Sequence, residues 1–457
     1  MRMSKQINTR VIKLQSGNHT RPVISLAISL ALLALIASGI ATTSAQRATP
    51  GPEAKNAAAQ NAAFVAATNE VLKETSEIRE LAVLRPVQSS AQSRAEIQQM
   101  IMNNLDRETT PAQIHATEVT LKRLGLAPPD FRFRDLMIRL LTEQVAGYYD
   151  PKSQKFHLAD WIDVDGQKPI MAHELTHALQ DQHFNLRRFE KWPKGDSDTE
   201  LAIHALIEGD ATLAMASYVS RSPSRMIALF KSLGTAGVAS QELDKAPRAV
   251  RESLLFPYQE GLAFAQTVHK FGGWKEVSEA YTNLPQSTEQ IRHPEKFFAR
   301  EAPVKVSLPD ISATLNGRRG RLQGWKRIDF DVNGEWGTYL ILDQFLKSPV
   351  ESQQAAAGWG GDSYAVYENR AGQALYVSVS TWDREKDARE FFDAYVKRTE
   401  LRYPGTVSAP AQNLADSRQF ETGEGTVVIQ LRGSRVLVLE GVTRQLNWRT
   451  LVSALKF

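Results

Sequence analysis

The sequence predicts an α+β protein in which a mostly helical part precedes a separate C-terminal α+β domain. Up to about residue 281, most periodic segments have the apolar spacing that is typical of helices. After about residue 303, strand-like runs surround a helix instead. Because 457 residues exceed what one hydrophobic core usually holds, two or three domains are expected.

The first 45 residues have the composition of a secretory signal. They contain five basic residues, no acid occurs before Glu53, and an apolar run spans residues 23–41 before the small residues Thr43 and Ala45. This run is also just long enough to span a bilayer, so the alternative is a retained N-terminal anchor, although the small residues favour cleavage. In both cases the rest of the chain is expected in the periplasm or outside the cell, with no other membrane contact.

Charge and cysteine content exclude several classes of function. Residues 1–45 hold five of the 55 Lys and Arg and none of the 51 Asp and Glu, so the chain without them has a net charge of −1. The pI of about 9.0 therefore comes largely from this segment and does not indicate nucleic-acid binding. Because the chain has no cysteine, disulfides and Cys-ligated metals are excluded.

Residues 46–60, rich in Ala, Gln, Pro and Gly, are expected to form a flexible leader, and residues 61–302 a helical region that includes the functional domain. Four helices are predicted first, at about 62–81, 93–105, 111–124 (with Thr110 as N-cap before Pro111) and 131–145. Two short strands around a turn and two long helices are predicted next, at about 147–151, 155–158, 167–184 and 199–219.

Residues 303–457 are predicted to form the C-terminal α+β domain. Its strand-like runs surround one helix, at 384–399, and lie at 364–368, 374–380, 426–431 and 435–440. A further helix closes the chain. The glycines of residues 358–362 predict a tight turn that enters a strand, and they lack the strand-then-helix context of a nucleotide-binding loop.

His173, Glu174 and His177 form a pattern that predicts a metal site with a catalytic base. Two histidines four residues apart lie on one face of a helix and can bind one ion together. The glutamate is offset around the helix, so it can lie beside the ion and deprotonate a bound water without being a ligand. The alternative is that both histidines are ordinary polar residues of an amphipathic helix.

A catalytic zinc site needs a third protein ligand, and two residues compete for that position. His183 follows His173 at the spacing of the HExxHxxGxxH motif of metzincins, but Gln180 replaces the glycine that breaks the helix there, so His183 should point away. Glu208 on the next helix is the better candidate, because a carboxylate among apolar neighbours is usually paired or bound to a metal. Gly209 would let the two helices approach closely.

His173-Glu174-Leu175-Thr176-His177 followed by Glu208 resembles the gluzincins, the thermolysin-like group of zinc metallopeptidases. The flanking residues 143–151, 178–184 and 287–294 resemble those of uncharacterised secreted bacterial proteins of this kind. The resemblance implies a zincin-like core with a small edge sheet, one Zn²⁺ ion, a peptide or protein substrate, and Glu174 as general base.

One departure from gluzincins concerns the support of the zinc-bound histidines. Gluzincins often place an aspartate four residues after the third ligand for this purpose, but here that position is Thr212. Asp210 and Asp181 remain as candidates for the role.

Such sites usually add a hydrogen-bond donor for the oxyanion that develops during hydrolysis. His293 is the first candidate for this donor, and Tyr258, Tyr148 and Tyr149 are others; each has a simpler interpretation as a surface histidine or a core aromatic. His204, one turn before Glu208, could be an alternative ligand or a partner of that carboxylate, or a plain surface histidine.

The sequence therefore predicts an exported zinc metallohydrolase, in particular a peptidase. The alternative is a non-catalytic zinc-containing binding or scaffold protein of the cell envelope, in which the C-terminal domain engages a partner. Glu174 favours the enzyme, since a purely structural zinc site needs no base at that position.

Overall fold

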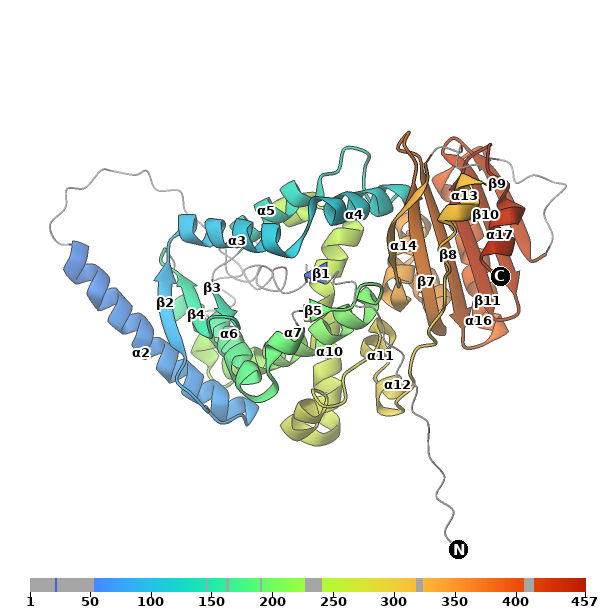
Figure 1. Cartoon of the computed structure of the whole chain (residues 1–457). Helices are drawn as coiled ribbons and strands as arrows, with labels where there is room; N and C mark the ends of the chain where they lie inside the picture. The colour runs from blue at the N-terminus through green and yellow to red at the C-terminus, as the bar shows by residue number, and fades with distance from the viewer. Residues whose placement is uncertain are drawn as a thin grey trace, which may run out of the picture.

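The computed structural model describes residues 21–22, 53–144, 147–161, 164–189, 191–226, 241–317, 324–406 and 415–457. The predicted signal or anchor, residues 1–45, lies outside them except for β1 (Arg21–Pro22), which pairs with β5 (Lys191–Trp192). Within the described residues, no helix is long and apolar enough to cross a membrane. The predicted α+β class is confirmed, with a helical half beside a half built on a large sheet (Figure 1).

The helical half begins at Glu53, within the stretch that was expected to be a flexible leader. Its helices are α2 (Glu53–Arg79), α3 (Arg94–Glu108), α4 (Pro111–Arg123), α5 (Phe133–Gln144), α6 (Val164–Phe184), η2 (Leu186–Phe189), α7 (Ser197–Ser220), α9 (Gln241–Lys245), α10 (Arg248–Glu279), α11 (Thr288–Arg292) and α12 (Pro294–Phe298). Thr110 caps α4 as predicted, because its side chain accepts a hydrogen bond from the Gln113 amide. Helices α2, α7 and the small sheet surround α6.

The small sheet has the strand order β2-β4-β3. β3 (Gly147–Asp150) and β4 (Lys155–Ala159) form the predicted antiparallel pair. The third strand, β2 (Gln88–Gln92), pairs with β4 in parallel and was not predicted, because its sequence Gln-Ser-Ser-Ala-Gln has no apolar alternation. β3 is thus an edge strand, and it lies against α6.

The C-terminal half is a six-stranded antiparallel sheet of order β6-β7-β8-β11-β10-β9 with helices on both faces. Its strands are β6 (Lys326–Asp331), β7 (Trp359–Glu368), β8 (Ala374–Trp382), β9 (Ser417–Thr422), β10 (Gly425–Arg432) and β11 (Arg435–Val442). Its helices are α13 (Ser312–Asn316), α14 (Gly334–Leu346), α15 (Pro349–Ala356), α16 (Glu385–Arg402) and α17 (Trp448–Ala454). Alternate strand residues enter opposite cores: Val427 packs on the side of α16, and Val428 on the side of α17.

Five elements of this half were not predicted: β6, β9, α13, α14 and α15. Helix α14 shows why, because ten of its residues are buried and its apolar residues form no single stripe. A helix that is buried on most sides has no amphipathic period to detect.

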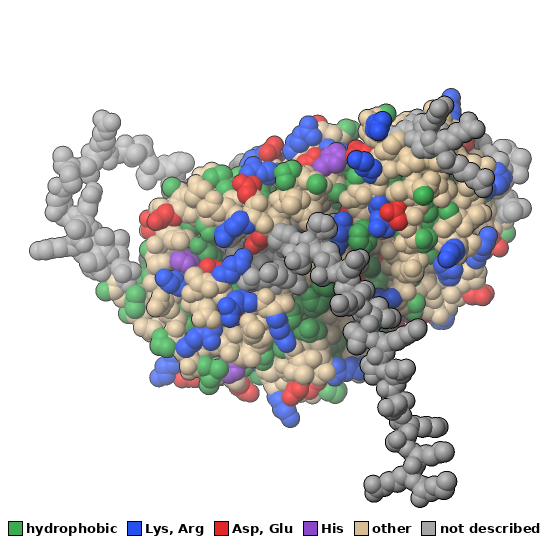
Figure 2. Space-filling model, in the orientation of Figure 1, with side chains coloured by type: hydrophobic (Ala, Val, Ile, Leu, Met, Phe, Trp, Pro, Cys, Tyr) green, Lys and Arg blue, Asp and Glu red, His purple; other side chains and the backbone are tan. Residues whose placement is uncertain are grey.

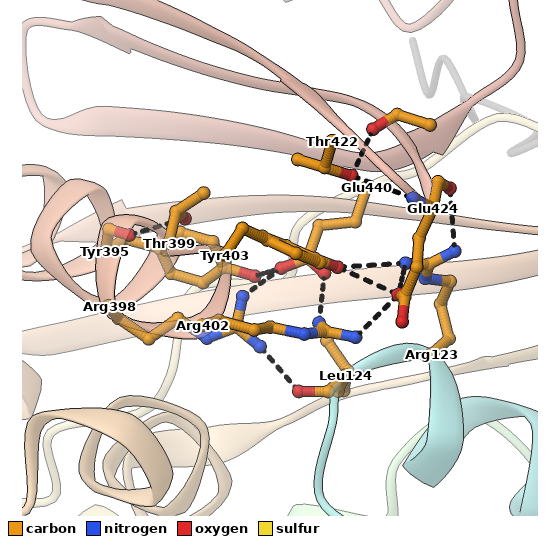
Figure 3. Close-up of polar contacts among 11 residues, drawn as sticks. Arg123, Leu124, Tyr395, Arg398, Thr399, Arg402, Tyr403, Thr422, Glu424 and Glu440 are labelled. Carbon is orange, nitrogen blue, oxygen red and sulfur yellow. Dashed lines mark hydrogen bonds and ion pairs between the residues drawn. The ribbon is translucent and has the colours of Figure 1, made fainter. Parts of the chain in front are cut away.

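A buried group of charges joins the C-terminal sheet to α4 (Figure 3). Glu440 of β11 accepts hydrogen bonds from Arg398 and Arg402 of α16, and Arg398 also donates to the Leu124 carbonyl at the end of α4, over 2.6 Å. At its rim, Arg402 and Arg123 both pair with Glu424. We call Arg123, Tyr395, Arg398, Arg402, Tyr403, Glu424 and Glu440 the Glu440 cluster.

Candidate metal site

His173 and His177 of α6 meet Glu208 of α7 inside the helical half. The two histidine Nε2 atoms are 2.9 Å apart, and Glu208 Oε2 lies 3.1 Å from that of His173 and 3.5 Å from that of His177. Two ligands about 2.1 Å from one ion in a tetrahedral site lie about 3.4 Å apart, so these separations suit a shared ion. The predicted triad is therefore a buried group that could hold a metal ion.

Gly209 brings α7 against α10, not against α6 as expected. A Cβ atom added to Gly209 would lie 2.0 Å from the carbonyl oxygen of Gly261, and one added to Gly261 would lie 2.2 Å from that of Ala205. Each glycine is thus required by the backbone of the other helix. The contact carries Tyr258, about one turn before Gly261, towards Glu208.

Burial and mutual charge set the pKa values of the triad. Burial lowers the pKa of His173 to about 4, against the opposing hydrogen bond with Glu208. At His177, burial is outweighed by the charge of Glu208, and the pKa is raised to about 9. At Glu208, burial is outweighed by the charge of His177 and by hydrogen bonds with both histidines, so its pKa falls below its ordinary value. The carboxylate thus stabilises positive charge in the space that the imidazoles share.

Glu174 lies beside the triad without belonging to it. Its Oε2 accepts a hydrogen bond of 2.9 Å from the backbone amide of Tyr149 in β3. Burial raises the pKa of Glu174 to about 7; the charge of His177 opposes the shift and that of Glu208 adds to it. A carboxyl group with such a pKa can accept and return a proton near neutral pH, which is the property required of a base at this position.

His177 is supported from behind through Gln180, a residue whose role was not predicted. Gln180 Oε1 lies 2.8 Å from His177 Nδ1, while its Nε2 donates to Asp210 Oδ2 over 2.9 Å and to the Ile207 carbonyl over 3.0 Å. With its amide nitrogen so used, Gln180 accepts from the Nδ1–H of His177, which leaves Nε2 as the nitrogen that faces the site and would bind an ion after losing its proton.

Asp210 accepts hydrogen bonds in turn from Arg79 and Tyr281, so this chain of contacts ends at buried residues. It therefore supports His177 indirectly, through Gln180. Asp181, the other candidate, serves the neighbouring strand instead: it accepts hydrogen bonds from the Tyr149 hydroxyl and from Arg85.

His183 and His293 are not brought to the triad. Helix α6 continues unbroken to Phe184, and His183 Nε2 lies 2.8 Å from the Ala82 carbonyl on the exposed side, in agreement with its rejection as third ligand. His293, the first candidate for the oxyanion donor, lies with its Nε2 3.1 Å from Glu335 Oε1 of α14. The contacts described for His293 thus join two helices outside the site.

Tyr258 is the candidate donor that does reach the site. Its ring stacks on His173 with 6.3 Å between centroids, and its hydroxyl hydrogen-bonds to Glu208. Tyr148, in contrast, donates to Gln92 at the far side of the small sheet. His204 is buried near Glu208, and burial lowers its pKa to about 4, but it is not one of the three residues whose ligand atoms converge.

Comparison with known proteins bears only on the C-terminal half. A family model described as "Domain of unknown function (DUF8575)" matches residues 321–448, which run from just before β6 to the start of α17 and do not include the metal site. No curated protein and no solved structure matches the chain. A functional assignment therefore depends on the geometry of the site itself.

Proposed function

We propose that the chain is an exported zinc metallopeptidase with a zincin-like core, in which Glu174 is the general base. The observation that carries this proposal is the position of Glu174, a buried carboxyl group beside His173, His177 and Glu208 that is not one of the converging ligands. A site that only stabilises the fold gains nothing from a second, protonatable carboxyl group at this position.

The donor set favours zinc over other ions. Two imidazole nitrogens and one carboxylate oxygen form the His₂Glu set of catalytic zinc sites, whereas magnesium and calcium prefer oxygen ligands throughout. Three protein ligands also leave one position for water and substrate.

Hydrolysis replaces the C–N bond of the amide by a C–O bond to a water oxygen, and a proton must pass to the leaving amine. A bound zinc ion would acidify the water and polarise the substrate carbonyl. Glu174 accepts the proton of the water and delivers it to the amine, while the Tyr149 amide holds one of its oxygens in place. The Tyr258 hydroxyl exchanges its hydrogen bond to Glu208 for one to the substrate carbonyl oxygen as negative charge develops there.

Metal analysis tests the ligand assignment. The wild type is expected to bind one zinc ion, and Glu208→Ala should lower its zinc affinity by more than about 100-fold, because a direct ligand contributes more than a supporting residue. Zinc content is measured by mass spectrometry, and affinity by competition with a chromophoric chelator. His183→Ala, on the same helix as the pair, is the matched control and should keep all its zinc. Full zinc binding by Glu208→Ala would exclude Glu208 as a ligand.

Peptidase activity is tested by incubating the zinc-loaded protein with a peptide library and identifying the products by mass spectrometry. Cleavage that chelation stops and zinc restores is expected. Stoichiometric zinc without cleavage of any peptide or unfolded protein would contradict the enzyme and favour a binding or scaffold protein.

Tyr258→Phe is expected to lower kcat by about 10²–10³-fold, because it removes a donor aimed at the developing negative charge. KM should change little, and the assay is run at saturating zinc because loss of the hydrogen bond to Glu208 should lower zinc affinity by about 10–100-fold at most. Steady-state kinetics on a library-derived peptide measure the effect. Tyr148→Phe is the control with unchanged kcat, and an unchanged kcat in Tyr258→Phe would remove Tyr258 from the mechanism.

A further inference from the structure

A mostly apolar cavity of about 330 Å³ lies between the two halves of the molecule. The helical half lines it with residues of α4, α5, α7 and α10, among them Met137, Leu201 and Leu254. The C-terminal half closes it with α14 and β7, chiefly through Trp336 and Leu340. Figure 2 shows hydrophobic side chains in the hollow between the halves.

Two helices that line the cavity, α7 and α10, also carry residues of the metal site. Leu201 precedes Glu208 by two turns on α7, about 10 Å along the axis, and Leu254 precedes Tyr258 by one turn on α10, about 6 Å along the axis. Tyr258 also packs against the hydrophobic cluster that contains Met137 and Leu254. Its ring therefore contacts both this cluster and His173.

We propose that this cavity receives a large apolar side chain of the peptide substrate and that α14 makes the C-terminal half part of the specificity site. The proposal rests on the proposed function, because it places the scissile bond at the triad. The rise of about 10 Å from Leu201 to Glu208 corresponds to about three residues of extended peptide, so a residue about three positions from the scissile bond can reach the cavity wall. The volume is within the range of pockets that bind small ligands, about 300–1,000 Å³.

The polar end of the cavity argues against a charged side chain. Asp198 lies there, but its two carboxylate oxygens already accept hydrogen bonds from the amide and the hydroxyl of Thr288. Gly334 also lies against this carboxyl, since a Cβ atom there would be 1.6 Å from Oδ1. Burial raises the pKa of Asp198 to about 8, so it presents little negative charge to a basic side chain at neutral pH. An acidic side chain would be disfavoured as well, because the residues that contact Asp198, Thr288 and Gly334, carry no positive charge to pair with it.

Gly337 provides the test, because it lines the cavity on α14 and has room for a side chain. A Cβ atom there meets only the Asn333 Cβ, at 3.4 Å. Gly337→Leu should therefore fill the cavity. It should not destabilise α14, because leucine has a higher helix propensity than glycine. Ala249→Leu fills it from α10 on the opposite wall, and Gly337→Ala is the matched control that leaves most of the volume.

Two measurements are made on each variant. The wild type should cleave peptides with Leu or Phe near the scissile bond in preference to Lys or Glu, and both Leu variants should lower kcat/KM for the Leu and Phe peptides by about 10–200-fold relative to Ala peptides, with zinc content unchanged. Binding is followed separately by ¹⁹F NMR of 5-fluorotryptophan protein, with the Trp336 resonance assigned from Trp336→Phe. In Glu174→Gln protein a Phe-containing peptide should shift this resonance, and adding Gly337→Leu should abolish the shift.

The outcomes separate this proposal from the proposed function. Cleavage that requires Glu174 but keeps its preference in both Leu variants would overturn the pocket and leave the peptidase. A Trp336 shift with apolar peptides, in a protein that cleaves none, would support the pocket and overturn the peptidase. A wild-type preference for Lys or Glu, or a Trp336 resonance that no peptide moves, would overturn the pocket.

Discussion

Glu174→Gln is expected to lower kcat for peptide hydrolysis by about 10²–10⁴-fold while the protein still binds one zinc ion. The amide has the shape of the carboxyl group and can still accept the hydrogen bond from the Tyr149 amide, but it cannot accept the proton of the attacking water. Because Glu174 is not among the converging ligand atoms, the zinc affinity should remain close to that of the wild type.

The measurement is kcat on a library-derived peptide, with zinc content determined on the same preparation. Glu77→Gln makes the same chemical change at an exposed position of α2 and should leave kcat unchanged. Retained activity in Glu174→Gln would exclude Glu174 as the base. Loss of zinc from this variant would instead make Glu174 part of the metal-binding group.

The core of the site could be predicted because its information is local. His173 and His177 are one turn apart on one helix, so their spacing places both on the same face. Glu208 could be chosen over His183 from two further local facts, the apolar neighbours of Glu208 and the lack of a helix break after His177. The converging atoms of the structure agree with that choice.

The supporting residues depend on contacts between distant segments and were less predictable. Tyr258 was one of several candidates, and only the contact of Gly209 with Gly261 shows why it reaches Glu208. His293 was ranked first, but Glu335, 42 residues later, pairs with it. In the sequence, Gln180 was considered only because it replaces the glycine of the metzincin motif. Its position three residues after His177 on one helix could have predicted their contact.

The fold shows the same limit. Segments with a clear apolar period, such as α4, β10 and β11, lie where the sequence predicted them. β2 was missed because it is polar and is held by a parallel partner that follows it by more than 60 residues. α14 was missed because burial on most sides removes the period, and this is the helix that closes the cavity beside the metal site.

Glu440→Gln is expected to lower the free energy of unfolding by about 3–5 kcal/mol, the usual cost of removing one partner of a buried ion pair. Arg398 and Glu440 are both fully buried, so the substitution leaves the guanidinium group without its counter-charge and without access to water (Figure 3). Burial disfavours the charged Glu440, but the charges of Arg398, Arg402 and Arg123 outweigh burial and lower the pKa of Glu440 below its ordinary value. This lowered pKa means that the stabilisation is present above the ordinary carboxyl pKa and is lost as the pH falls through the value in the folded protein.

Urea unfolding at pH 7 measures the effect, and Glu424→Gln is the matched control within the Glu440 cluster. The Glu424 side chain is 51% exposed, so its ion pairs with Arg123 and Arg402 are screened by water and its loss should cost at most about 1 kcal/mol. Equal losses in the two variants would contradict the role of burial.

Removing Arg398 and Glu440 together separates the cost of leaving Arg398 without its counter-charge from the contribution of the ion pair to stability. Arg398→Met combined with Glu440→Leu should recover much of the stability lost in Glu440→Gln, because replacing a buried ion pair by apolar side chains of similar size is often neutral or stabilising. The recovery is limited by the Leu124 carbonyl, which loses its donor from Arg398, and by Arg402, which loses Glu440 and keeps the half-exposed Glu424 as its partner. If the double variant is as unstable as Glu440→Gln, the lone charge of Arg398 is not the cause of the loss in Glu440→Gln.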